Sequence, residues 1–171
     1  MEHRWKLGVL GLGEGRSILS AAKGSPLWEV AQICDLNEAL CKERVSEFDL
    51  ERYTLSYEKM LRDPSVDVVG IYTPDPLHSL HIRMALEAGK HVICTKPLMV
   101  SLEGAAELLE VQRKSGKHVM VGQSSRYFEG TMRQREDYEA GRHGELVTVE
   151  TQYISDSRWF LERAWSHASG F

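Results

Sequence analysis

The sequence predicts an α/β fold: a doubly wound, Rossmann-like parallel sheet, followed by the beginning of a truncated second α+β domain. Two observations predict the sheet. Six short apolar runs rich in Val and Ile alternate with segments of helical period, with few turn residues between them. Strands that are each separated by a helix pair in parallel, and helices then cover both faces of their sheet. The second observation is a glycine-rich turn between the first strand and the first helix.

The predicted elements follow the apolar runs in chain order. The strands cover residues 6–11, 28–35, 52–56, 66–73, 91–95 and 118–123, and the helices cover residues 16–23, 37–48, 57–63, 76–89, 101–116 and about 127–141. Gly89 and Gly116 stand where glycine usually ends a helix. In residues 145–155, side chains alternate between polar and apolar, so we expect the first strand of another sheet there. The break between the two domains is therefore predicted near residues 123–144.

Composition and charge exclude several classes of function. The chain has 171 residues, of which 42% are hydrophobic and 27% charged, and its net charge of −4 gives no basic field for nucleic acid. No run approaches the roughly 18 apolar residues of a membrane span, and the N-terminus lacks the features of a secretory signal. Cys34, Cys41 and Cys94 show no CxxC spacing, which favours buried thiols over a metal or redox site. We expect a cytoplasmic protein without nucleic-acid, membrane or metal partners.

The glycine-rich turn predicts a phosphate site. Gly11 and Gly13 stand between the first strand and the first helix, where a tight turn lets backbone N–H groups approach a pyrophosphate. Arg16 occupies the place of the third glycine in the GxGxxG pattern, and Gly15 is offered instead, after Glu14. The alternative is a strand–helix turn without a ligand.

Asp35 strengthens the dinucleotide interpretation. It ends the second strand, 24 residues after Gly11, where a carboxylate can accept both hydroxyls of an adenine ribose. The same carboxylate would repel a 2′-phosphate, so NAD is favoured over NADP, although Arg16 could meet such a phosphate. The alternative role of Asp35 is the N-cap of the helix over 37–48.

The segment "YTPDPLHSLHIRMALEAGKHVICTKPL" resembles the Gfo/Idh/MocA family (glucose–fructose oxidoreductase, inositol dehydrogenase and MocA). That family's pattern runs T-P-x-x-x-H, then A-L-x-A-G-K-H-V, then E-K-P. The matching residues are Thr73, Pro74, His78, Ala85, Leu86, Ala88, Gly89, Lys90, His91, Val92, Lys96 and Pro97. The resemblance continues through "HVMVGQSSRYFEGTMR" and "GRHGELVTVE", so it covers essentially the whole chain.

The resemblance implies an NAD(P)-dependent dehydrogenase that transfers hydride between nicotinamide and a sugar, polyol or related hydroxyl compound. It implies that Lys96 is the catalytic lysine and also lines the cofactor. Its remaining implied cofactor contacts come from the turn residues Gly11, Gly13, Glu14, Gly15 and Arg16, and from Asp35, Thr73, Pro74 and His78. Residues 1–124 would form the NAD(P)-binding domain, and residues 125–171 would begin a C-terminal domain for substrate binding or oligomerisation. A homo-oligomer is also expected.

Two departures from the family pattern leave a second function open. Thr95 stands where the family has Glu before the lysine, so a carboxylate that could pair with Lys96 is missing. The family's D-x-x-x-H pair for proton transfer belongs to the second domain, beyond the sequence shown. The alternatives are a non-catalytic NAD(H)-binding sensor or a structural subunit of the same fold.

For several other polar residues the sequence supports a functional role less strongly. His78 and His81 stand three apart on one helical face, but no third ligand completes a metal site, so a solvated or cofactor-side position is expected. Arg126 and Tyr127 follow the sixth strand and could reach the nicotinamide side of a cofactor.

Overall fold

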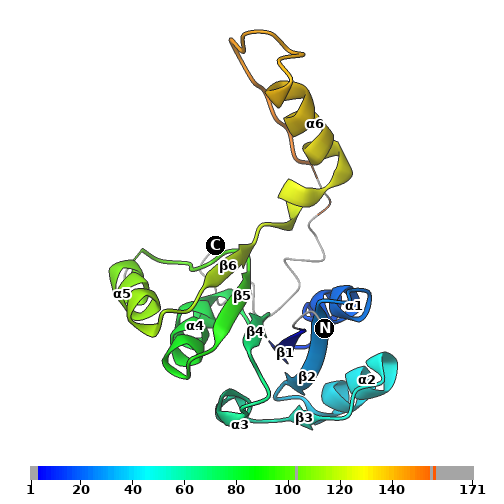
Figure 1. The fold of residues 1–171 in the computed structure, drawn as a ribbon, viewed down its shortest axis with the longest axis vertical. Helices are drawn as coiled ribbons and strands as arrows, with labels where there is room; N and C mark the ends of the chain where they lie inside the picture. Colours follow the sequence, from blue (N-terminus) through cyan, green and yellow to red (C-terminus); the bar gives the residue numbers. More distant parts are fainter. Residues whose placement is uncertain (1–3, 103, 155, 157–171) are drawn as a thin grey trace. The chain divides into compact units, whose positions relative to one another are not determined.

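The fold is shown by a computed structural model that describes residues 4–102, 104–154 and 156 (Figure 1). The chain divides into two units, Met1–Gly122 and Gln123–Phe171. The functional residues predicted from the sequence lie in the first unit, apart from Arg126 and Tyr127.

The first unit contains a six-stranded sheet, which confirms the predicted fold class. Its strands are β1 (Trp5–Leu10), β2 (Trp28–Cys34), β3 (Tyr53–Thr54), β4 (Val68–Ile71), β5 (His91–Thr95) and β6 (Val119–Gly122). They lie in the order β3-β2-β1-β4-β5-β6, and each neighbouring pair is parallel. This is the strand order of the dinucleotide-binding doubly wound fold.

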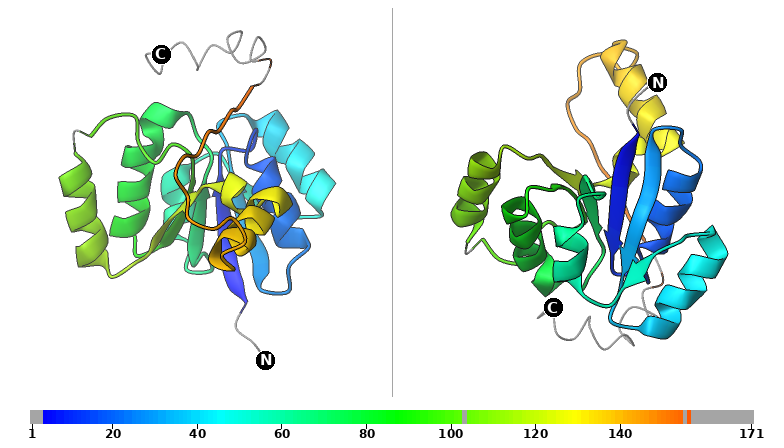
Figure 2. Two further views of the ribbon diagram at one scale, coloured as in Figure 1. Left: turned by 90° about the horizontal axis from the view of Figure 1, so that it is seen from above. Right: turned by 60° about the horizontal axis from the view of Figure 1, so that its bottom comes forward.

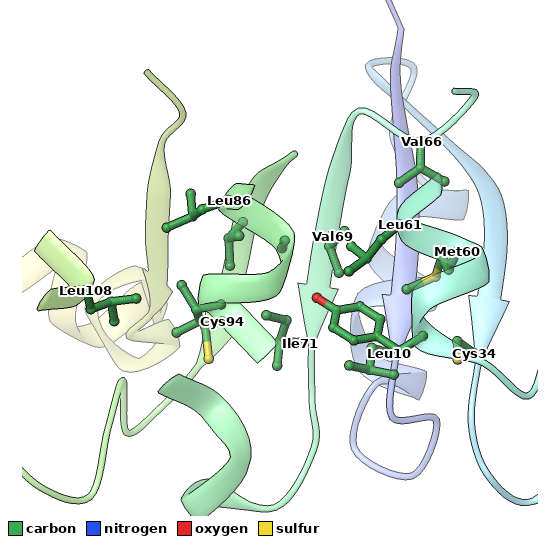
Figure 3. Close-up of a cluster of buried hydrophobic side chains, with 14 residues drawn as sticks. Leu10, Cys34, Met60, Leu61, Val66, Val69, Ile71, Leu86, Cys94 and Leu108 are labelled. Atoms are coloured by element: carbon green, nitrogen blue, oxygen red, sulfur yellow. The ribbon is translucent and has the colours of Figure 1, made fainter. Parts of the chain in front are cut away.

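Helices pack on both faces of the sheet (Figure 2). They are α1 (Arg16–Lys23), α2 (Glu38–Phe48), α3 (Tyr57–Arg62), α4 (His78–Glu87) and α5 (Ala105–Ser115), with a short 3-10 helix η1 (Asp75–Leu77) before α4. Buried residues of α1 and α2, such as Leu19 and Cys41, share one core cluster. Residues of α3, α4 and α5, such as Met60, Leu86 and Leu108, share the other (Figure 3).

The ends of the helices follow their local sequence. Asn37 is the N-cap of α2, and its side chain accepts a hydrogen bond from the backbone N–H of Leu40. The cap is therefore Asn37, and the alternative role of Asp35 as N-cap is wrong. Gly116 ends α5 with a positive φ of 64°, and Gly89 follows Ala88, the C-cap of α4, with a φ of 73°.

The three cysteines are free and buried, as expected from their apolar neighbours. Burial raises the pKa of the Cys34 and Cys94 thiols to about 12. Within the described residues no helix is long and apolar enough to cross a membrane.

The second unit contains the 3-10 helix η2 (Ser124–Tyr127) and helix α6 (Glu129–Glu139), as the sequence predicts for about 127–141. The strand predicted over 145–155 is wrong for residues 145–154, which have no strand conformation; residue 155 lies outside the described residues. A strand needs a hydrogen-bonded neighbour, and none is present in the described part of this unit. Its apolar side chains are accordingly exposed, Val147 at 92%.

Candidate cofactor site at the carboxyl edge of the sheet

The carboxyl ends of the central strands bring the predicted site residues to one edge of the sheet. Gly11 follows β1, Asp35 follows β2, Thr73 comes shortly after β4 and Lys96 follows β5. Helices α1 and α4 leave β1 and β4 toward opposite faces of the sheet. The boundary between β1 and β4 is therefore the switch point at which doubly wound sheets bind their ligands.

Two glycines of the first turn are required by the fold itself. Gly11 has a φ of +85°, and a β-carbon on it would lie 2.5 Å from the carbonyl oxygen of Tyr72. A β-carbon on Gly15 would lie 2.1 Å from the carbonyl oxygen of Gly11 and 3.0 Å from Val9 Cγ1. Gly15 thus allows the close approach of helix and strand that the third glycine of the pattern provides, one position early.

Gly13 differs from its neighbours because the protein leaves space beside it. A β-carbon on Gly13 would meet no atom within 4 Å, and its φ is not in the left-handed region. The residue is exposed and lies in the turn that leads into α1. The open space beside Gly13 lies at the positive N-terminal end of α1. A side chain at position 13 would fill this space, whereas glycine leaves it open for a pyrophosphate, so the turn fits such a group.

Asp35 joins this turn to the end of the second strand. Its Oδ2 accepts a hydrogen bond of 2.8 Å from the N–H of Leu12, and its Oδ1 accepts one of 2.9 Å from the N–H of Asn37. Each carboxylate oxygen has two lone pairs, so both can still accept a ribose hydroxyl. The side chain is therefore fixed beside the phosphate turn and keeps acceptor capacity.

Arg16 is paired with an acidic residue of the neighbouring helix. Its Nε donates to Glu47 Oε1 at 2.6 Å, and this contact raises the pKa of Arg16 and lowers that of Glu47. Glu47 also accepts from Arg44 Nη1 at 2.8 Å, and Arg44 Nε donates to the carbonyl oxygen of Leu12 at 3.3 Å.

Arg44 and Glu47 were missed in the sequence analysis. The available signal was an arginine on the buried face of α2, one turn after Cys41.

The segment after β4 is held by two histidines of α4. The backbone carbonyl of Thr73 lies 2.9 Å from His78 Nε2, and its hydroxyl lies 2.9 Å from His81 Nδ1. His81 is half-buried, and this burial lowers its pKa. His78 is fully buried, so its expected solvated position is wrong. No group of three potential metal ligands exists among the described residues.

Lys96 leaves the carboxyl end of β5 with an exposed side chain. Within the described part of the chain its ammonium group makes no hydrogen bond or ion pair. The Lys96–Pro97 peptide bond is cis. The following residues, Leu98 and Met99, pack against the core cluster of α3, α4 and α5. The lysine therefore projects from a loop whose next residues are anchored in the core.

Together, the fold and the turn that fits a pyrophosphate define a nucleotide-binding protein of the Rossmann class. Residues 5–123 match the model of the Gfo/Idh/MocA oxidoreductase family, described as having an NAD-binding Rossmann fold. The chain belongs to that family, which confirms the resemblance carried by residues 72–98.

Several relatives and solved structures are similar to this chain. Mouse trans-1,2-dihydrobenzene-1,2-diol dehydrogenase is 31% identical, over 99% of this chain and 52% of that protein. The D-xylose 1-dehydrogenase (NADP(+)) 2 of Haloferax volcanii is 31% identical, over 86% of this chain and 44% of its own length. A crystal structure of an NAD-binding protein from Listeria innocua is 32% identical with a TM-score of 0.75, over 83% of this chain and 42% of that one. The chain thus spans about half or less of these proteins.

Proposed function

We propose that this chain is the cofactor-binding part of an NAD-dependent dehydrogenase that acts on a hydroxyl group of a sugar, polyol or related compound. The observation that carries the proposal is the open space at Gly13, beside the carboxylate of Asp35. The fold needs glycine at positions 11 and 15 for its own packing, but it has no such need at position 13. Because the fold does not require glycine at position 13, its presence there supports the proposal that a ligand closely approaches the backbone at this position.

In this proposal each half of the site holds one half of the dinucleotide. The turn over residues 11–16, with Glu14 at its exposed surface, donates backbone N–H groups to the pyrophosphate, and Asp35 accepts from the adenosine ribose. The backbone at Thr73 and Pro74 lines the nicotinamide half. The bound cofactor supplies a nicotinamide C4 that accepts or returns a hydride.

Lys96 is proposed as the catalytic residue. Its ammonium would stabilise the alkoxide that develops on the substrate oxygen as hydride leaves the carbon for the nicotinamide and the proton of the hydroxyl passes to solvent. Its lack of a partner within the described residues leaves it available to a substrate.

The proposal favours NAD over NADP. The carboxylate of Asp35 would face a 2′-phosphate with like charge, and Arg16, the cation that could compensate, is paired with Glu47. The Haloferax volcanii relative has NADP(+) in its name, and titration of this chain with both cofactors measures the preference.

The substrate class, assembly and compartment are also proposed. The names of two relatives, a dihydrodiol dehydrogenase and a xylose dehydrogenase, support a small polyhydroxylated substrate. Three buried, unpaired thiols support a reducing, cytoplasm-like compartment. A homo-oligomer is proposed from the family resemblance alone.

A second candidate is an NAD(H)-binding sensor without turnover. Thr95 precedes Lys96 where the family pattern has Glu. A threonine hydroxyl is neutral, so it cannot form an ion pair with the ammonium of Lys96. Dehydrogenase and sensor share the cofactor site and differ in whether Lys96 meets a substrate.

Calorimetric titration of the 171-residue chain with NAD⁺ and NADP⁺ tests the proposal. We expect NAD⁺ to bind more tightly than NADP⁺, and binding of neither would overturn both candidates. A panel of polyols and sugars assayed with the full-length reading frame then separates them. Reduction of NAD⁺ with any of these compounds supports the dehydrogenase, whereas binding without turnover supports the sensor.

A further inference from the structure

His78 is a fully buried ionisable side chain that the proposed chemistry does not use. It is the first residue of α4, and its exposed fraction is 0%. Both ring nitrogens lie within hydrogen-bond distance of a backbone carbonyl oxygen. Nδ1 is 2.7 Å from the oxygen of Pro97, and Nε2 is 2.9 Å from the oxygen of Thr73.

The two carbonyls belong to the two loops that form the nicotinamide half of the proposed site. Thr73 lies after β4, next to Tyr72. The N–H of Tyr72 donates to the carbonyl oxygen of Leu10 at 2.8 Å, and the carbonyl oxygen of Tyr72 leaves no room for a β-carbon on Gly11. Pro97 lies after β5 and is bonded directly to Lys96. The imidazole therefore spans from the loop beside the phosphate turn to the residue that follows the proposed catalytic lysine.

Direct contact between this imidazole and a cofactor does not fit the geometry. The ring has no exposed surface, and both of its nitrogens already face protein oxygens. The expectation that His78 itself binds the cofactor is therefore replaced by an indirect role.

We propose that His78 is a positioning residue that joins the loop after β4 to the loop after β5 and thereby fixes Lys96 against the nicotinamide end of the site. This inference rests on the proposed function. A carbonyl oxygen only accepts, so each contact needs an N–H on the ring; a neutral imidazole supplies one and an imidazolium two. The side chain of Lys96 has no anchor of its own within the described residues, so its position depends on the backbone of its loop.

His81 provides a matched control on the same helix. Its Nδ1 contacts the hydroxyl of Thr73, its backbone oxygen accepts from Tyr57 at 2.9 Å, and its ring packs edge-on against that tyrosine. Among the described residues it makes no hydrogen bond to the loop that carries Lys96. Loss of its ring nitrogens affects the loop after β4 alone.

Two substitutions separate the two contacts of His78. The amide nitrogen of asparagine is as many bonds from Cα as Nδ1, so His78→Asn can keep the donor to Pro97. The amide nitrogen of glutamine corresponds in the same way to Nε2, so His78→Gln can keep the donor to Thr73 and loses the bridge to the loop of Lys96. His81→Gln serves as the control.

The experiment compares NADH with ADP-ribose, which lacks nicotinamide, on the 171-residue chain. In His78→Gln we expect NADH to bind roughly 3- to 10-fold more weakly, the effect of losing one hydrogen bond. The fluorescence of bound nicotinamide should also shift toward that of free NADH, while ADP-ribose affinity stays unchanged. His78→Asn and His81→Gln should retain the wild-type nicotinamide signal.

Each outcome decides a different point. Equal behaviour of His78→Asn and His78→Gln, or the same loss in His81→Gln, would overturn the positioning role. So would a failure of both His78 variants to fold while His81→Gln folds, because His78 would then be a core residue only. If the wild-type chain binds neither NADH nor ADP-ribose, the proposed function on which the inference rests is overturned instead.

Discussion

The two halves of the proposed site are built in different ways. The adenosine half, formed by the turn over residues 11–16 and Asp35, is held by close backbone packing and by a carboxylate that bonds two neighbouring N–H groups. The nicotinamide half, formed by Thr73, Pro74 and Lys96, is held by two histidines of α4, and only the buried imidazole of His78 reaches both loops. The first half depends on contacts between residues that are specified by type, mainly glycine and aspartate. The second depends on a long-range contact between α4 and the segment after β5.

This difference indicates which half tolerates change. A glycine with a positive φ or a close backbone contact cannot be replaced without displacing its neighbours. A loop held through a hydrogen bond can shift and keep the fold. We therefore expect substitutions of Gly11, Gly15 and Asp35 to affect folding and cofactor affinity together, and those in the nicotinamide half to affect chemistry first.

The largest effect is expected for Gly15→Ala. Its new β-carbon would lie 2.1 Å from the carbonyl oxygen of Gly11, which is backbone and cannot move aside alone. We expect the free energy of unfolding to fall by about 3 kcal/mol or more, measured by urea denaturation. Gly13→Ala is the control: it should leave unfolding unchanged within about 0.5 kcal/mol but weaken NAD⁺ binding. Similar unfolding curves for the two variants would contradict the steric difference between these positions.

The same contrast explains what the sequence could and could not predict. The glycine turn and Asp35 were found from spacing because their roles depend on residue type at fixed separations along β1, α1 and β2. The position of His78 could not be found in this way, since its two partners lie 5 and 19 residues away and no periodicity links them. Likewise, the polar–apolar alternation over 145–154 predicted a strand, but a strand also requires a neighbour that local sequence does not supply.

The next effect concerns Lys96→Ala in the full-length reading frame. The ammonium is proposed to act on the developing alkoxide, so kcat should fall by roughly 100-fold or more, far more than the Kd for NAD⁺ rises. Lys96→Arg should not restore turnover, because a planar guanidinium cannot place a point charge at the same position. Steady-state kinetics and calorimetry on both variants check this. Near-wild-type turnover in the alanine variant would mean that Lys96 is only an exposed residue at the end of β5 and has no catalytic role.

A smaller effect is expected for Asp35→Ala. Loss of the carboxylate should weaken NAD⁺ binding by about 1–3 kcal/mol, since the proposed charge-assisted hydrogen bond to the ribose would be removed. Asp35 also bonds Leu12 and Asn37, so some loss of stability accompanies the change. Asn37→Ala is the matched control, because it removes the N-cap of α2 and should lower stability while leaving NAD⁺ affinity intact. If calorimetry shows an unchanged affinity for NAD⁺ in Asp35→Ala, the role of Asp35 is only to accept hydrogen bonds from the backbone N–H groups of Leu12 and Asn37.

The smallest effect is expected for Glu47→Gln, and it concerns cofactor choice within the adenosine half. Glu47 pairs with Arg16, whose guanidinium is largely exposed next to the glycine turn, and it also pairs with Arg44. Without that carboxylate, Arg16 keeps its charge and loses its partner, so a 2′-phosphate should meet less repulsion overall. Because exposed ion pairs are weak, we expect the ratio of NADP⁺ to NAD⁺ affinity to rise by less than about fivefold, and less at high salt. Parallel titrations of both cofactors at two salt concentrations measure the ratio. A fall in the ratio, or a rise that salt does not reduce, would mean that Glu47 acts through Arg44 and the carbonyl of Leu12 instead of through the charge of Arg16.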